Sequence, residues 1–257
     1  MRHLWSVFLW SWIVLWGIIL CVIGLVLFVP LNPWVDPRRH LWDFMGKMWG
    51  KGVLFMLPFI DVDLVGTENL GKGPYLICPN HTSIADTVVL LAVLPLFKFI
   101  GRGVIFHVPP LSLQARLAGY IRAGSGEEGD AERVLRETKR WLSLGSNVLV
   151  FPEGTRSKDG RTLRFRKGPL LLAQTAGVQI LPVAVSGNHY IIPKGSFSYR
   201  FYGKVRVEVL PPMDATGELK DIAARARTAV QGALKPDYLW QEAGPNPRAT
   251  AVPTAGP

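Results

Sequence analysis

Disulfides, metal clusters and acidic residues are what this sequence has least of. Only two cysteines occur in 257 residues, Cys21 and Cys78, too few for a disulfide framework and without metal-site spacing. We therefore expect a reducing compartment and no bound metal. Asp and Glu number 19 against 29 Lys and Arg, a formal charge of +10, which favours anionic partners such as lipid headgroups. No zinc-knuckle, RNA-recognition or basic heptad pattern is present, so nucleic acid is the weaker choice of partner.

Charge is absent altogether from Leu4 to Val29. A helix of that length, at about 1.5 Å per residue, crosses a hydrocarbon core roughly 30 Å thick. The stretch is longer than the apolar region of a signal peptide, and no small-x-small cleavage site follows it. We predict that residues 1–30 form a retained single-pass transmembrane anchor. Basic residues such as Arg38 and Arg39 follow it, which predicts the inner (cytoplasmic) membrane with the catalytic domain on the cytoplasmic face. Four tryptophans crowd one half of the stretch, where we expect them at the membrane interface: Trp5, Trp10, Trp12 and Trp16.

The next segment, residues 31–62, has an amphipathic pattern. Apolar side chains recur at helical spacing from Leu41 to Trp49, while Asp43, Lys47 and Lys51 lie on or near the other side. This pattern predicts a helix that lies in the membrane interface. A helix packed on the core of the domain has the same pattern, so both interpretations stay open. Residues 52–60 continue apolar and extend the segment towards lipid.

Strands alternate with helices through residues 63–240, the predicted catalytic domain. We expect strands near 74–78, 99–105, 147–151, 179–185 and 204–210. We expect helices near 84–95, 110–119, 127–143, 167–176 and 218–234. This order predicts an α/β fold with a central, mostly parallel sheet flanked by helices. The alternating strand 204–210 suits an edge of the sheet, and the Pro-, Ala- and Gly-rich tail, residues 241–257, is typical of disorder.

The first chemical cluster follows the apolar run that ends at Cys78. His81 comes directly after this predicted strand, and Asp86 lies five positions further on. Histidine is the natural general base near neutral pH, and a carboxylate on one ring nitrogen fixes its tautomer. The two side chains can meet if His81 lies in the loop and Asp86 in the first turn of the helix. Ser83 as the N-cap supports this arrangement, but Asp86 could equally act only as part of the cap.

The second cluster, residues 151–157, follows another buried strand and reads Phe-Pro-Glu-Gly-Thr-Arg-Ser. Gly154 permits unusual backbone angles, and Arg156 presents a bidentate anion donor. More basic residues follow up to Lys167. A solvated charged loop is the usual meaning of such a run. Its position at the end of a strand favours a phosphate-binding platform.

Together the two clusters resemble the glycerolipid acyltransferase family typified by 1-acylglycerol-3-phosphate acyltransferase (PlsC-like). The family's His-x4-Asp motif is matched by His81 and Asp86, and its Phe-Pro-Glu-Gly-Thr-Arg-Ser motif is matched without change. Relatives also carry a phosphate-binding arginine between the motifs. Gly119-Tyr120-Ile121-Arg122 is the nearest fit, although the usual acid-then-arginine ending is replaced here by Arg122-Ala123. The similarity spans roughly residues 75–186.

The resemblance implies an enzyme that moves a fatty acyl chain from acyl-CoA or acyl-ACP (acyl carrier protein) to the sn-2 hydroxyl of 1-acylglycerol 3-phosphate. His81 would deprotonate the hydroxyl, Asp86 would orient His81, and the thioester would be attacked directly without a cofactor or metal. The implied substrate-binding residues are Asn80, Thr82, Ser83, Arg122, Glu153, Gly154, Thr155 and Arg156. Backbone N–H groups near Gly154 or at the helix start after His81 are the expected oxyanion donors.

Several assignments stay open. Glu153 either contacts the substrate or pairs with a neighbouring base. Lys98 and Arg102 either bind a pantetheine phosphate or carrier, or are two solvated surface charges. Two rival functions remain: an acyltransferase with another lysolipid acceptor, which the altered pattern at Arg122 favours, and a non-catalytic membrane lipid-binding protein.

Overall fold

The computed structural model describes residues 2–28, 36–107, 111–124, 128–157, 160–196, 198–200 and 202–235. The α-helices are α1 (Arg2–Phe28), α2 (His40–Phe55), α3 (Ala85–Val93), α4 (Leu111–Ala118), α5 (Asp130–Ser143), α6 (Lys167–Ala176), α7 (Asn188–Ile191) and α8 (Leu219–Ala233). The strands are β1 (Ile60–Val65), β2 (Leu76–Pro79), β3 (Phe97–Arg102), β4 (Ile121–Ala123), β5 (Asn147–Val150), β6 (Ile180–Ser186) and β7 (Gly203–Val209). The predicted tail, residues 241–257, lies outside the described residues.

The strands form one sheet in the order β1-β7-β6-β2-β5-β3-β4. Strands β6, β2, β5, β3 and β4 are mutually parallel, whereas β7 runs antiparallel to β6 and pairs in parallel with β1. The prediction of a mostly parallel α/β sheet is therefore confirmed. The expectation that 204–210 sits at an edge is wrong, because β1 covers it. Strand β1 begins at Ile60, so it crosses the domain boundary that was predicted at residue 62.

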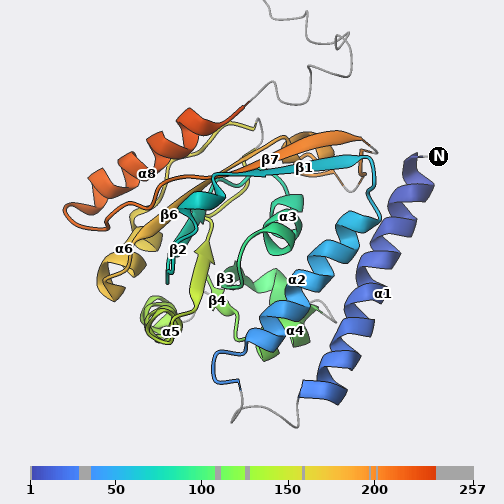
Figure 1. Ribbon diagram of the computed structural model, residues 1–257, viewed down its shortest axis with the longest axis horizontal. Coiled ribbons are helices and arrows are strands. Elements are labelled where there is room, and N and C mark those ends of the chain that lie inside the picture. Colours follow the sequence, from blue (N-terminus) through green and yellow to red (C-terminus); the bar gives the residue numbers. More distant parts are fainter. Residues whose placement is uncertain are drawn as a thin grey trace, which may run out of the picture.

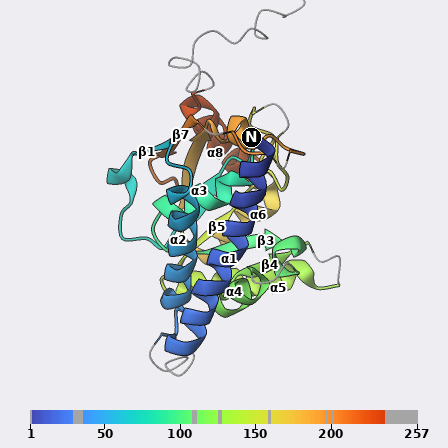
Figure 2. The same cartoon turned by 90° about the vertical axis from the view of Figure 1, so that its right-hand side faces the viewer.

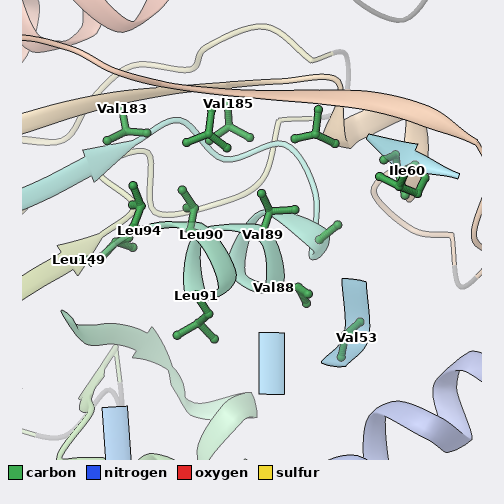
Figure 3. Packing of buried hydrophobic residues seen from close by; sticks show 14 of the residues in the cluster. Val53, Ile60, Val88, Val89, Leu90, Leu91, Leu94, Leu149, Val183 and Val185 are labelled. Carbon is green, nitrogen blue, oxygen red and sulfur yellow. The ribbon is translucent and has the colours of Figure 1, made fainter. Parts of the chain in front are cut away.

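Helices cover both faces of the sheet, with α1, α2 and α3 on one side and α5, α6 and α8 on the other (Figure 1). Strand alternation produces this division. In β5, Leu149 packs with the first group while Val148 and Val150 pack with the second. Figure 3 shows how α3 fills the space between layers: Leu90 points to the sheet near Val185, and Leu91 points away from it.

The N-terminal helices α1 and α2 lie side by side as an antiparallel hairpin (Figure 2). Three indole N–H groups hydrogen-bond across the hairpin to backbone carbonyls: Trp12 to Gly52 (3.1 Å), Trp16 to Met48 (3.2 Å) and Trp49 to Ile13 (3.1 Å). Buried indoles need such partners. Trp12 and Trp16, which the sequence assigned to a membrane interface, therefore bond to α2.

One face of α1 packs on the domain and the other is exposed and apolar. Leu9 and Ile13 are buried in the main core, whereas Leu4, Val7 and Val26 are more than 60% exposed. By length and composition Leu4–Val26 qualifies as a membrane span. The helix is apolar enough for the predicted anchor, but it is bound to α2 along much of its length.

Helix α2 lies within residues 31–62, the segment predicted to be amphipathic, and packs between α1 and α3. Trp42, Met45 and Val53 are buried, and Phe44 is half exposed. The alternative of a helix packed on the core describes these contacts, and its placement in a membrane interface stays a prediction. Asp43 is 2% exposed, so its expected position on the polar side of the helix is wrong.

Candidate active site

His81 lies in the loop that joins β2 to α3, at the carboxyl edge of the parallel strands. The preceding residue fixes this loop: the Asn80 side chain accepts from the Val185 N–H (2.7 Å) and donates to the Val185 carbonyl (3.0 Å) of β6. Asn80 is fully buried. Because both ends of its amide are bonded to β6, we assign Asn80 to the support of the loop rather than to the substrate.

The Asp86 carboxylate lies at the start of α3, and one of its oxygens contacts three groups of the preceding loop. Its Oδ2 lies 2.9 Å from His81 Nδ1 and accepts the N–H groups of Thr82 (2.7 Å) and Ser83 (2.8 Å). In the neutral imidazole, Nδ1 then carries the proton and Nε2 is left as the basic nitrogen. The contact that the sequence required between a loop histidine and a first-turn carboxylate is thus present.

Ser83 holds the turn from the other side. Its hydroxyl accepts from the Ala85 N–H (3.1 Å) and donates to the Ile192 carbonyl (2.8 Å). The helix begins at Ala85 with Ile84 as its N-cap, one residue later than predicted. The bond from the Ser83 N–H to Asp86 is one half of a capping box, whereas the Ser83 hydroxyl accepts from Ala85 instead of Asp86. Asp86 therefore serves as a helix cap and as the partner of His81 at once.

The second cluster packs directly on His81. The Phe151 ring stacks on the imidazole, with ring centroids 3.8 Å apart and planes at 11°. Glu153 Oε1 accepts the His81 N–H (3.2 Å), and the Ser157 N–H donates to the His81 carbonyl (2.8 Å). The two motifs, 72 residues apart, thus fix the ring and both peptide groups of one histidine.

Glu153 is 2% exposed, and burial raises its pKa to about 7, against the lowering effect of the His81 and Leu163 N–H groups. Its Oε2 has no hydrogen-bond partner within the described residues. The sequence offered substrate contact or an ion pair as its role, and the structure adds a third: Glu153 holds the backbone of His81. The unpartnered oxygen stays available to a substrate hydroxyl.

The rest of the motif forms the rim of the site. Gly154 has φ 69°, and a Cβ there would come within 3.0 Å of Arg166 Nε. Lys194 Nζ donates to the Arg156 carbonyl (2.6 Å), which brings another cation to the loop. Sequence reasoning missed Lys194 because no motif surrounds it. Its only signal is a basic residue directly after a Pro.

The expected oxyanion donors are committed elsewhere. The Gly154 N–H donates to the Phe151 carbonyl at 3.1 Å. The N–H groups of Thr82 and Ser83 both donate to Asp86. These three N–H groups are therefore already bonded within the protein, and an oxyanion hole formed by other N–H groups of the two loops stays a prediction.

Arg122 lies on β4 at the same carboxyl edge, but β5 and β3 separate that strand from β2. At about 4.8 Å per strand this is roughly 14 Å. Its Nε is buried without a partner among the described residues. Arg102, at the end of β3, is exposed. Lys98 is fully buried against Asp43 (2.7 Å), so neither role predicted for it holds.

An apolar cavity of about 170 Å³ opens beside the histidine loop. Ile84, from the turn after His81, and Thr87 of α3 line it together with Met45 and Gly46 of α2 and Ala115 of α4. A chain of rings leads from the site into it. Phe151 contacts Phe99 edge-on (5.9 Å between centroids), and Phe99 contacts Tyr120 in the same way (6.3 Å). A cavity with such a lining suits a long hydrocarbon chain.

Comparisons with known proteins agree with this geometry. A family model described as "Acyltransferase" matches residues 61–186. The chain is 32% identical over 210 residues to the chloroplastic 1-acyl-sn-glycerol-3-phosphate acyltransferase LPAT1 of Arabidopsis thaliana, covering 77% of this chain and 58% of that one. It is 30% identical over 203 residues to the 1-acyl-sn-glycerol-3-phosphate acyltransferase of Limnanthes alba, covering 78% and 68%. It spans about three-fifths of the length of the chloroplastic relatives from Arabidopsis thaliana and Brassica napus.

Among solved structures, the chain is similar to the crystal structure of the 1-acyl-sn-glycerophosphate acyltransferase PlsC from Thermotoga maritima. The TM-score is 0.75 at 26% sequence identity, with 90% of this chain and 93% of that chain covered.

Proposed function

Because the chain belongs to the acyltransferase family, we propose that it transfers a fatty acyl group from an acyl thioester to the free hydroxyl of 1-acylglycerol 3-phosphate, giving phosphatidic acid. The carrying observation is the 2.9 Å contact between His81 Nδ1 and the buried Asp86 carboxylate, beside an apolar cavity. The names of the relatives support the acceptor.

In the proposed mechanism His81 Nε2 takes the proton of the acceptor hydroxyl while Asp86 holds Nδ1–H and stabilises the imidazolium that forms. The oxygen attacks the thioester carbonyl and forms a tetrahedral intermediate. The intermediate then collapses, the C–S bond breaks, and the thiolate leaves and takes the proton from His81. The acyl chain lies in the apolar cavity, which places its carbonyl carbon near the ring.

Glu153 and Arg156 are proposed to hold the acceptor. The unpartnered Glu153 Oε2 can accept a hydrogen bond from a glycerol hydroxyl, and the half-buried Arg156 side chain sits on the rim beside Lys194. A cationic rim of this kind favours a phosphate monoester over a neutral headgroup. Arg122 is proposed as a second phosphate contact at the same edge of the sheet.

The exposed face of α1 is proposed to contact the bilayer that contains the acceptor. Its apolar side chains form one continuous stripe on the helix. The donor is proposed to be acyl-CoA or acyl carrier protein on the cytoplasmic side. Arg39 is weaker support for this membrane orientation than the sequence suggested, because its guanidinium donates to the Arg116 carbonyl of α4 (3.0 Å) and does not face the membrane surface alone.

The test measures thiol release from an acyl thioester by the full chain in detergent micelles. We expect release that depends on 1-acylglycerol 3-phosphate, with His81→Ala reducing it between about 10²- and 10⁴-fold. His107→Ala, at an exposed histidine, is the matched control and should retain full activity. Faster release with a phosphate-free lysolipid would favour another acceptor, and no release with any lysolipid would overturn the enzymatic proposal.

A further inference from the structure

The segment that follows α7 contacts the loops of both motifs, although it belongs to neither motif. The Ile192 carbonyl accepts the Ser83 hydroxyl (2.8 Å) and so holds the turn before α3. Two positions further on, Lys194 Nζ donates to the Arg156 carbonyl (2.6 Å) and lies 3.4 Å from Thr155 Oγ1. A short stretch of chain outside the motifs therefore joins the loop that contains the histidine to the loop that contains the arginine.

A tight turn carries Lys194 and fixes its backbone. The Ser196 N–H donates to the Pro193 carbonyl (3.0 Å) across this turn, and Gly195, its third residue, has φ 88°. A positive φ at the third position is what a type II turn requires, and glycine adopts it without strain. Ile192, directly before the turn, is fully buried. Because the turn is closed by its own bond and begins next to a buried residue, it presents the lysine side chain from a fixed position.

The bond that Lys194 donates continues through one peptide group to His81. The Arg156 carbonyl and the Ser157 N–H belong to the same peptide group, and this N–H donates to the His81 carbonyl (2.8 Å). A cation at the carbonyl end polarises the peptide group and strengthens the bond that its N–H donates. Lys194 therefore stabilises the backbone position of His81 from a distance, through the second motif.

Two roles suit a cation at this place: binding the phosphate of the acceptor, or holding the loop. Within the described residues, both hydrogen-bond partners of Lys194 are oxygens of the motif loop, and neither is a carboxylate. The 2.6 Å bond to Arg156 is made to the main chain, so the contact exists before any substrate binds. This geometry favours the second role.

We propose that Lys194 is a positioning residue, which holds the Arg156–Ser157 peptide group and thereby keeps His81 in its reactive arrangement. This rests on the proposed function, in which His81 is the general base. A charged donor suits the task because its bond to a carbonyl is stronger than a bond between neutral groups. Since the lysine acts through the loop and not on the acceptor, its loss lowers the rate of the chemical step and leaves the affinity for the acceptor nearly unchanged.

The first measurement is kcat and KM for 1-acylglycerol 3-phosphate, with the full chain in detergent. Lys194→Met keeps the length of the side chain but has no donor, so we expect kcat to fall about tenfold while KM stays within about twofold. Lys194→Arg keeps a cation with N–H donors and should restore kcat to within about threefold of the wild type. Lys220→Met, at an exposed lysine of α8, is the matched control and should leave both constants unchanged.

The second measurement needs no substrate. Diethyl pyrocarbonate modifies neutral imidazoles, and mass spectrometry of peptides follows each histidine separately. In Lys194→Met we expect His81 to react about tenfold faster, because a loop that has lost a charge-assisted bond opens more often. His107, which is exposed, serves as the internal reference and should react at the same rate in all variants.

Thermal unfolding shows whether each variant is folded. If Lys194→Met does not fold, Lys194→Gln replaces it, because its amide keeps one neutral donor, and both readouts should then change in the same direction by less. An unchanged kcat and an unchanged modification rate of His81 in a folded variant overturn the proposal. A rise in KM alone also overturns it, because that result indicates direct contact with the phosphate, and so does an arginine variant as slow as the methionine variant. If the wild type releases no thiol, the proposed function fails, and the modification rates alone decide the role of Lys194.

Discussion

Two buried carboxylates in this protein each contact a nitrogen base, but the exposure of the two bases differs. Asp86 and Asp43 are 0% and 2% exposed, and each holds a nitrogen base through Oδ2, at 2.9 and 2.7 Å. The His81 side chain is 17% exposed beside a cavity, whereas Lys98 is fully enclosed. A carboxylate beside a base is therefore not by itself a catalytic site. Whether such a pair can act in catalysis depends on whether a substrate can reach the base.

The two sites also differ in how the carboxylate is compensated. Asp86 accepts two backbone N–H groups besides His81, which are supplied by the turn that it caps. Asp43 has Lys98 as its partner, and burial raises the pKa of Asp43 to about 7 although Lys98 opposes the shift. Burial likewise lowers the pKa of Lys98. In the proposed mechanism the loop stabilises a charge that forms on His81, whereas Lys98 and Asp43 neutralise each other away from any substrate.

The strongest test of this contrast is Asp86→Asn. The amide cannot accept from Nδ1–H and both backbone N–H groups as a carboxylate does. His81 is then no longer held in the Nδ1–H tautomer, and its imidazolium form is no longer stabilised. We expect acyl transfer to fall between about 10²- and 10⁴-fold, measured as the rate of thiol release at saturating acceptor. Asp43→Asn should keep the rate within about threefold, because Asp43 bonds to Lys98 and does not line the cavity beside His81. Equal losses in the two variants would remove the distinction between the sites.

Lys98→Met tests the enclosed pair by leaving Asp43 without its cation. Removing one partner of a buried pair costs about 3–5 kcal/mol of unfolding free energy, which urea titration in detergent measures. Arg206→Met breaks a partly exposed pair with Asp63 and should cost less than about 1 kcal/mol. Similar costs for the two variants would show that the Lys98 ammonium is hydrated in solution.

The free energy of unfolding measured over a range of pH tests the raised pKa of Glu153. Its pKa is raised from 4.5 to about 7, so the folded protein keeps a proton that the unfolded chain releases. This contribution to stability is fully present below pH 4.5 and is lost as the pH rises through 7, by up to about 3 kcal/mol. Asp43 contributes in the same direction, so the difference between wild type and Glu153→Gln isolates Glu153. We expect the variant to lose less stability over this interval, and parallel curves would contradict the assignment.

The sequence predicted the sheet side of the molecule well because its signals are local. Buried strands predicted to end at Cys78 and Phe151, each followed by a proline and then polar residues, predicted both loops, and parallel strands bring such loops to one edge. Helix 167–176 agrees with α6 residue for residue. Two strands were missed for physical reasons. β4 has three residues, and β1 alternates Asp61 and Asp63 with apolar residues after a run that resembled a membrane segment.

The contacts of the helical hairpin could not be predicted from the sequence, because they join residues with no shared motif. Asp43 looked like a surface residue on an amphipathic helix, and Lys98 like an exposed charge. Only the fold shows that they meet 55 positions apart. The same holds for Asn80, whose partner Val185 is 105 positions away. A motif identified the residues around His81, but their division into support and chemistry needed the hydrogen bonds.

The smallest predicted effect concerns α1 itself. Trp16→Phe keeps an aromatic ring but removes the N–H that donates to the Met48 carbonyl, so we expect a loss of about 1 kcal/mol in unfolding free energy, measured by urea titration in detergent. Leu15→Ala, on the half-exposed face of α1, should cost less, because detergent and lipid tails are as apolar as leucine. If Trp16→Phe changes nothing, α1 has left α2 in the detergent or membrane environment. That outcome would favour the free-standing transmembrane anchor over the hairpin, and the wall of the cavity that α1 supplies through Trp10 and Ile13 would then open to lipid.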